Sequence, residues 1–161
     1  MTDHVTEDRF RMVTSLGTQF VTVRLAGQLL GIPVLSVHDV LNAQKITRIP
    51  LAAGWIAGVL NLRGRIVTAI NLRERLGFPP RDDGDEDMSI VVEYNNESYS
   101  LQIDTVGEVL NLDDEPMEKN PVTLDKRWRE VSRGIYRLEK ELLVILDVRR
   151  ILEMDQVEAA A

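Results

Sequence analysis

The chain has 161 residues, a formal net charge of −7 and a sequence pI near 4.9. This length suits one ordinary domain or two small ones, with 44% hydrophobic residues to build a core. The acidic balance argues against nonspecific nucleic-acid binding, which needs a basic face that displaces counterions. The lack of cysteine excludes disulfides, thiolate metal sites and cysteine nucleophiles, and it fits a reducing cytosol.

Residues 1–18 are expected to form an N-terminal extension. They hold charged side chains and no apolar stretch of the kind found in signal peptides. No apolar run in the chain approaches the roughly 20 residues that span a bilayer. These features predict a cytoplasmic protein without direct membrane insertion.

The chain reads as two copies of one pattern. Residues 20–42 align without a gap on residues 89–111, so that Val37 matches Val106, and residues 58–76 align on residues 134–152. Identities are few, and two unrelated amphipathic strands can share a period of two. The paired order of two such blocks nevertheless favours an internal duplication.

Each half is expected to hold about five short strands. In the first half, residues 21–25 alternate between apolar and polar side chains, and a second strand is expected to return after the turn Ala26-Gly27. In the second half, Asn95-Asn96-Glu97 separates two similar apolar runs. Five short antiparallel strands leave exposed edges in a flat sheet, and closure into a small barrel removes them. The fold class is therefore predicted as mainly β, with two five-stranded barrels and short helices.

The most informative segment is a hairpin in the first half. Apolar runs at residues 59–62 and 66–70 flank Arg63-Gly64, where glycine accepts the positive φ of a tight turn. This hairpin is expected to close the sheet of the first half, and residues 72–77 predict a short helix ended by Gly77. Arg63 is either a solvated turn residue or an exposed anchor for a partner.

An acidic segment separates the halves. Residues 79–87 begin with two prolines and continue as Asp-rich sequence, which predicts a solvated linker. Its Asp-Gly-Asp order does not match a calcium loop, whose glycine follows three alternating ligands. Residues 153–161 are expected to form a loose tail.

Catalytic chemistry has little support in the sequence. The two histidines, His4 and His38, lie far apart, so neither predicts a general base with a partner. Asp39, Asp104 and Glu108 lie on or beside predicted strands and keep open the alternative of a carboxylate-based acid–base enzyme. Duplicated turn or rim charges are the favoured explanation of these residues. No metal or cofactor is predicted.

Several blocks resemble the family of the bacterial chemotaxis coupling protein CheW. They are Gln-Phe-Val-Thr-Val at 19–23, Gly-Ile-Pro-Val at 31–34, Ile-Thr-Arg-Ile-Pro at 46–50, Gly-Val-Leu-Asn-Leu-Arg-Gly at 58–64 and Asn-Leu-Arg at 71–73. The resemblance extends to about Leu152. Two residues depart from the family pattern: Thr68 stands where proline is usual, and Asn71 stands where aspartate is usual.

The resemblance implies a single CheW-like domain over 19–152, built from two interleaved SH3-like barrel subdomains, with halves at about 19–78 and 88–152. It further implies a non-enzymatic adaptor between chemoreceptor cytoplasmic tips and the regulatory domain of the chemotaxis histidine kinase CheA, in receptor arrays at the inner face of the membrane. A module of another chemosensory pathway, such as surface motility, is the alternative.

The family's receptor contacts fall on Val37, Gly58, Arg63 and Val106. From the repeat alone, Val37 and Val106 could line the seam between the barrels or could be ordinary core valines.

Overall fold

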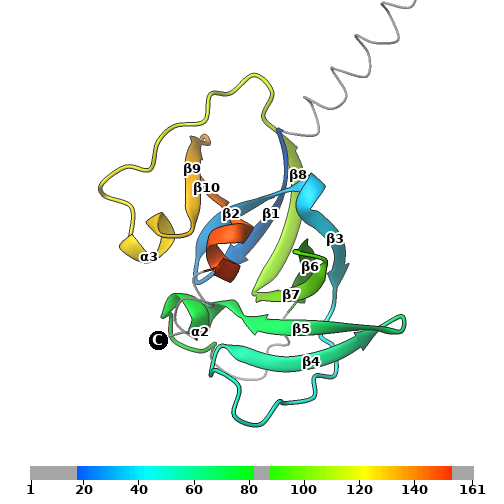
Figure 1. Ribbon diagram of the computed structural model, residues 1–161. Helices are drawn as coiled ribbons and strands as arrows, with labels where there is room; N and C mark the ends of the chain where they lie inside the picture. Colours follow the sequence, from blue (N-terminus) through cyan, green and yellow to red (C-terminus); the bar gives the residue numbers. More distant parts are fainter. Residues whose placement is uncertain (1–17, 82–87, 154–161) are drawn as a thin grey trace, which may run out of the picture.

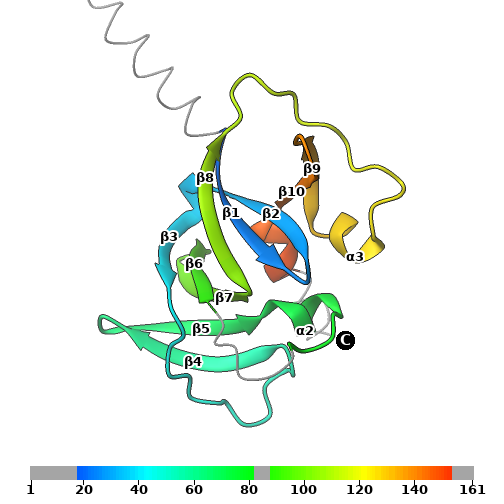
Figure 2. The ribbon, with the colours of Figure 1, turned by 180° about the vertical axis from the view of Figure 1, so that it is seen from behind.

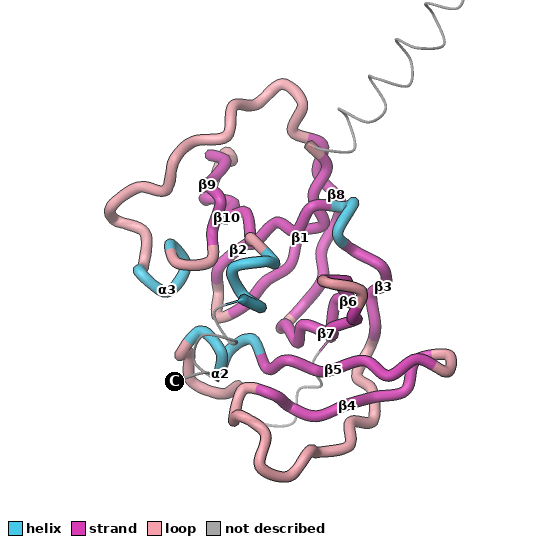
Figure 3. The backbone as a smooth tube through the Cα atoms, in the orientation of Figure 1, coloured by secondary structure: helices cyan, strands magenta, loops and turns pink. Residues whose placement is uncertain are grey.

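The computed structural model describes residues 18–81 and 88–153. The described chain is mainly β, with short helical segments at its turns and crossings (Figures 1 and 3). The strands are β1 (Gln19–Leu25), β2 (Gln28–Pro33), β3 (Val37–Leu41), β4 (Ile56–Leu62), β5 (Arg65–Asn71), β6 (Met88–Tyr94), β7 (Glu97–Ile103), β8 (Thr105–Asn111), β9 (Ser132–Arg137) and β10 (Leu142–Leu146). The helical segments are η1 (Val34–Ser36), α2 (Leu72–Leu76) and α3 (Lys126–Arg129), and residues 148–153 are also helical.

The strands form two five-stranded sheets, in agreement with the predicted fold class. Sheet A has the order β8-β1-β2-β10-β9, and sheet B has the order β3-β6-β7-β5-β4. Each sheet therefore takes strands from both halves of the sequence. The expectation that the first half closes its own sheet is wrong, because β1 and β2 lie in sheet A whereas the β4–β5 hairpin lies in sheet B.

The registers confirm the internal duplication. In sheet A, Val23 pairs with Leu30 and Val106, and at the matching place in sheet B, Val92 pairs with Tyr99 and Val37. Both edge strands carry a bulge just beyond the matched valine. The parallel pairings β2–β10 and β5–β7 also correspond. The two sheets are thus copies of one arrangement, with strands exchanged between the halves.

Three tight turns explain the local hairpins. Ala26-Gly27, Arg63-Gly64 and Asn95-Asn96 all have positive φ at both residues. This geometry belongs to type I′ turns, whose twist matches that of paired strands. At the β4–β5 tip, the Gly64 N–H also donates to the Asn61 Oδ1 at 2.9 Å. The tip projects from sheet B in both opposite views (Figures 1 and 2).

A shared apolar core lies between the sheets, and each sheet has a smaller core of its own. The shared core takes Val23, Leu30 and Ile32 from sheet A and Ile90 and Leu101 from sheet B, all fully buried. The sheet A core draws on all five of its strands, including the edges β8 and β9. The sheet B core likewise joins its two edges, β3 and β4. Each sheet therefore curls toward a barrel, with its inner face around its own core.

Helix α2 begins and ends as the sequence predicts. The Asn71 side chain accepts a hydrogen bond from the Glu74 N–H, which caps the first turn, and Gly77 adopts left-handed geometry at the C-cap. Asn71 thus supplies a capping acceptor at the position where the family usually has aspartate. Thr68 lies in β5, paired with Val59 on one side and Tyr99 on the other.

The N-terminal extension up to residue 17, the acidic stretch 82–87 and the tail from residue 154 lie outside the described residues. The start of the predicted linker is described, and Arg81 forms an ion pair with Asp104 at 3.5 Å. Among the described helices, none is long and apolar enough to cross a membrane.

Candidate functional site

Val37 and Val106 occupy equivalent places on the two edge strands that follow the crossings between the sheets. Both are half-buried and pack against the shared core, and their strand-register partners are Val92 and Val23 respectively. The sequence left open whether these valines belong to the core or to a contact surface, and the structure is compatible with both roles for each valine. One side of the residue contributes to the core, and the rest remains accessible to a partner.

Arg63 lies at the tip of the β4–β5 hairpin, with a side chain that is 81% exposed. Its Nη2 is 3.4 Å from the Asp39 Oδ2 on β3, two residues beyond Val37. The ion pair brings the hairpin tip beside the opposite edge of sheet B. An exposed pair of this kind contributes at most about 1 kcal/mol to folding, so both charges remain available for exchange with a partner's groups.

Gly58 is buried in β4 and has a φ of +146°. A Cβ at this position would lie 2.2 Å from the Thr47 carbonyl oxygen, and Thr47 and Val59 form backbone hydrogen bonds in both directions. In the same way, a Cβ at the matching Gly134 would lie 2.6 Å from the Glu118 carbonyl oxygen. Any effect of Gly58 on a partner would therefore pass through the placement of this strand.

The three carboxylates considered for acid–base chemistry do not form one site. Asp39 pairs with Arg63, Glu108 is exposed on β8, and Asp104 is enclosed by two arginines. Among the described residues, no group of three acidic or histidine side chains could hold a metal ion. His38 is exposed, with its Nε2 3.4 Å from a Glu93 carboxylate oxygen.

Asp104 is a structural residue whose role the sequence did not reveal. Burial alone would raise the pKa of its carboxyl group, but hydrogen bonds from Arg73 and the Ala26 N–H, with the charges of Arg73 and Arg81, hold that pKa below its usual value. A carboxylate held ionised in this way is a poor proton acceptor. The repeat shows only that Asp104 departs from its counterpart Leu35; it does not show which residues Asp104 contacts.

Comparison with known proteins places these features in one family. The model of the CheW-like domain matches residues 19–156. The chain is 28% identical to the chemotaxis protein CheW of Bacillus subtilis over 89% of this chain and 92% of that protein. It is 25% identical to a probable chemotaxis protein CheW of Rhizobium etli, with 88% and 92% covered.

A solved structure shows the same fold. The crystal structure of the scaffolding protein TtCheW from Thermoanaerobacter tengcongensis matches with a TM-score of 0.71 and 30% identity, over 81% of this chain and 88% of that one. The family match covers most of the sequence, including both sheets and all four candidate contact residues. The chain therefore belongs to the CheW-like domain family.

Proposed function

We propose that this chain is a non-enzymatic adaptor that couples chemoreceptor cytoplasmic tips to the regulatory domain of the histidine kinase CheA. Membership of the CheW-like family supports this proposal, as do relatives named as chemotaxis proteins and a solved relative described as a scaffolding protein. The observation that carries it is the duplicated architecture. Two equivalent sheets provide two equivalent edge surfaces that are joined through one shared core, which an adaptor with two partners needs.

The receptor surface is proposed at Val37, Val106 and Arg63, with Gly58 supporting it from within β4. The two valines offer apolar contact on either side of the shared core, which suits the apolar ridge of a helical receptor tip. Arg63 would fix the orientation of the tip, because its guanidinium makes forked hydrogen bonds and is already exposed.

The adaptor acts through geometry. The shared core buries side chains from both sheets, so a partner bound to one sheet has a defined placement relative to a partner bound to the other. A shift of the receptor tip then changes the free energy of kinase docking, or the free energy of the kinase's active conformation. This change is a coupling between the receptor site and the kinase site.

Reconstitution with purified components tests this function. The full chain is mixed with a receptor signalling fragment and the kinase, and complex formation and autophosphorylation are measured with and without the chain. We expect a ternary complex and a change in kinase activity that both require the chain. Binding to only one partner, or to neither, would contradict the proposal. Recovery of a different receptor and kinase from native cells would assign the chain to another chemosensory pathway.

Cellular placement provides a second check. A fluorescent fusion of the full chain should gather at receptor clusters along the inner face of the membrane. It should become diffuse in cells that lack the receptors. Clusters that persist without receptors would contradict array association.

A further inference from the structure

The two sheets differ at one pair of equivalent positions. In sheet B, the tip of the β4–β5 hairpin is tied to the edge strand β3 by Arg63 and Asp39. In sheet A, the repeat puts Glu108 in the place of Asp39 and Glu139 in the place of Arg63. Both residues are exposed carboxylates, and two like charges cannot form the ion pair that joins the edges of sheet B.

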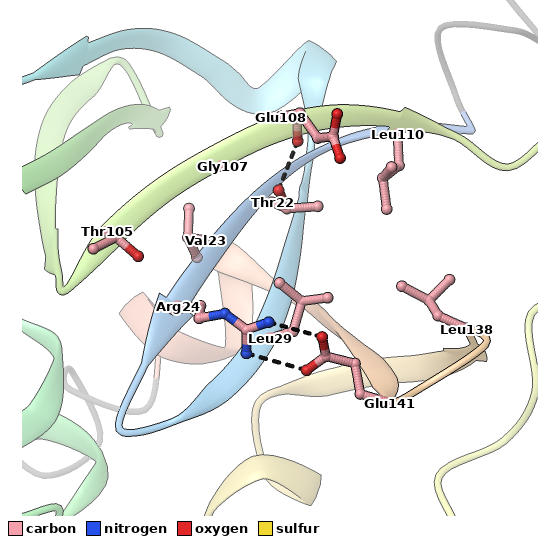
Figure 4. A pocket seen from close by; sticks show the side chains of 10 residues that line it. All are labelled: Thr22, Val23, Arg24, Leu29, Thr105, Gly107, Glu108, Leu110, Leu138 and Glu141. Carbon is pink, nitrogen blue, oxygen red and sulfur yellow. Dashed lines mark hydrogen bonds and ion pairs between the residues drawn. The ribbon is translucent and has the colours of Figure 1, made fainter.

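A cavity lies at this unjoined edge. It has a volume of about 360 Å³ and lies between β8, the neighbouring face of β1 and the turn that connects β9 to β10 (Figure 4). Leu29, Leu110 and Leu138 line it, and all three are half-buried against the core of sheet A. In sheet B, Leu41 takes the place of Leu110 and is only 8% exposed. Leu110 is thus more exposed than its counterpart in sheet B.

The charged residues that line the cavity are Arg24, Glu108 and Glu141. Thr22 donates its hydroxyl hydrogen to the Glu108 carbonyl oxygen at 2.6 Å, which holds the bulge of β8 in place. Arg24 makes two hydrogen bonds to Glu141, at 3.1 and 2.7 Å, and so neutralises that carboxylate (Figure 4). Among the described residues, Glu108 has no ion-pair partner, and it lies on β8, an edge strand of sheet A.

We propose that this cavity docks a segment of another protein that presents an arginine beside an aliphatic side chain. The aliphatic group would cover Leu110 and Leu138, and the guanidinium would bind Glu108, the lining carboxylate that has no ion pair in the described part of the chain. Sheet B supplies the template, because Leu62 packs on its core while the adjacent Arg63 binds Asp39. Arginine suits the site better than lysine, since its planar fork can bind both oxygens of one carboxylate. None of the lining residues is one of the four candidate receptor contacts, so the proposal does not depend on the proposed function.

A peptide titration tests the docking site. The probe is a cyclised peptide with residues 60–67 of this chain, which contains Leu62 and Arg63, and the control peptide carries alanine in place of that arginine. The full ¹⁵N-labelled chain is titrated with each peptide, and backbone amide shifts are followed. We expect saturable shifts at Thr22, Gly107 and Leu110 with the probe. The control peptide should bind about tenfold more weakly, as loss of one charge-assisted contact predicts.

Variants of the chain separate this site from general acidity. Glu108→Gln should weaken probe binding by a similar factor of about ten. Glu118→Gln should leave it unchanged, because Glu118 lies between β8 and β9, outside the cavity lining, and pairs with Arg137. Glu139→Arg gives sheet A the charge pair of sheet B. It should abolish probe binding and slow hydrogen exchange of the β8 amides, and the spectrum reports that the variant is folded.

Three outcomes would overturn the proposal. The first is a set of peptide shifts that lie away from the cavity. The second is probe binding that Glu108→Gln and Glu139→Arg leave unchanged. The third is self-association of the chain, seen by sedimentation and lost in Arg63→Ala, because the occupant would then be a second copy and not another protein.

Discussion

The guanidinium of Arg73 donates two hydrogen bonds to the Asp104 carboxylate, at 3.0 Å to Oδ1 and 2.7 Å to Oδ2. Asp104 separates β7 of sheet B from β8 of sheet A, at a crossing between the sheets. The same carboxylate accepts a hydrogen bond from the Ala26 N–H in the β1–β2 turn of sheet A, at 3.0 Å. One side chain therefore ties the two sheets together, with directional contacts that the apolar core between them does not provide.

Asp104→Asn should lower the free energy of unfolding by about 2 kcal/mol, because it removes the charge that two arginines surround at a site only 16% exposed. Urea denaturation measures the loss. Glu118→Gln is the matched control, since its ion pair with Arg137 is exposed and lies outside the crossing; it should cost about 0.5 kcal/mol or less. Equal effects of the two changes would mean that Asp104 is an ordinary surface charge.

The contribution of Asp104 should depend on pH with a defined sign. Its pKa is lower in the folded chain than in the unfolded chain, so the carboxylate stabilises the fold above its unfolded pKa of about 3.9. That stability is lost as the pH falls through the folded value. The difference in unfolding free energy between the wild type and Asp104→Asn should therefore be constant near neutral pH and shrink below about pH 4. A difference that grows on acidification would contradict the assignment.

Val37→Met and Val106→Met should each weaken receptor binding while the fold is retained. Both valines are half-buried, so a longer side chain can extend outward and obstruct the contact surface without a change in charge. Affinity for a receptor fragment and the melting temperature should be measured together. A large drop in melting temperature with unchanged affinity per folded molecule would assign both valines to the core alone.

Arg63→Ala should change stability by about 0.5 kcal/mol or less, because the side chain is exposed and its pair with Asp39 is long. Loss of an interface anchor should at the same time cost about 2 kcal/mol of receptor binding, or roughly thirtyfold in affinity. Arg65→Ala is the internal control, since Arg65 is also an exposed arginine of this hairpin. Similar small losses of affinity for both variants would show that Arg63 contributes only general surface charge.

Gly58→Ala should destabilise the fold by about 2 kcal/mol, because alanine disfavours the positive φ and its Cβ would collide with the Thr47 carbonyl. Receptor affinity per folded molecule should fall only to the extent that the substitution displaces β4 and the residues that β4 positions. Thermal unfolding and a receptor titration on the folded fraction distinguish the two effects. A variant of wild-type stability that fails to bind would instead make Gly58 a direct contact.

Local features of this protein follow from the sequence by itself. Alternating apolar residues predict β1 and β2, and Arg63-Gly64 and Gly77 predict a turn and a helix end, because each depends on the backbone preferences of adjacent residues. The internal duplication is also visible, since the apolar period and the glycines repeat in order. The resemblance of several blocks to one family led to the same fold class and to the candidate contacts.

The arrangement of the strands was decided only by the tertiary structure. The hairpin pattern suggested that each half closes its own sheet, whereas the family resemblance implied interleaved subdomains; in the structure β2 pairs with β10 and β5 pairs with β7 across the halves. The preference of each segment for a hairpin is local, and it is the same whether the halves form separate sheets or exchange strands. The choice of strand partners depends instead on the burial of a core that distant segments share. For the same reason, Asp104 could not be recognised as a link between sheets. Its partners Ala26 and Arg73 come near it only when both sheets have formed.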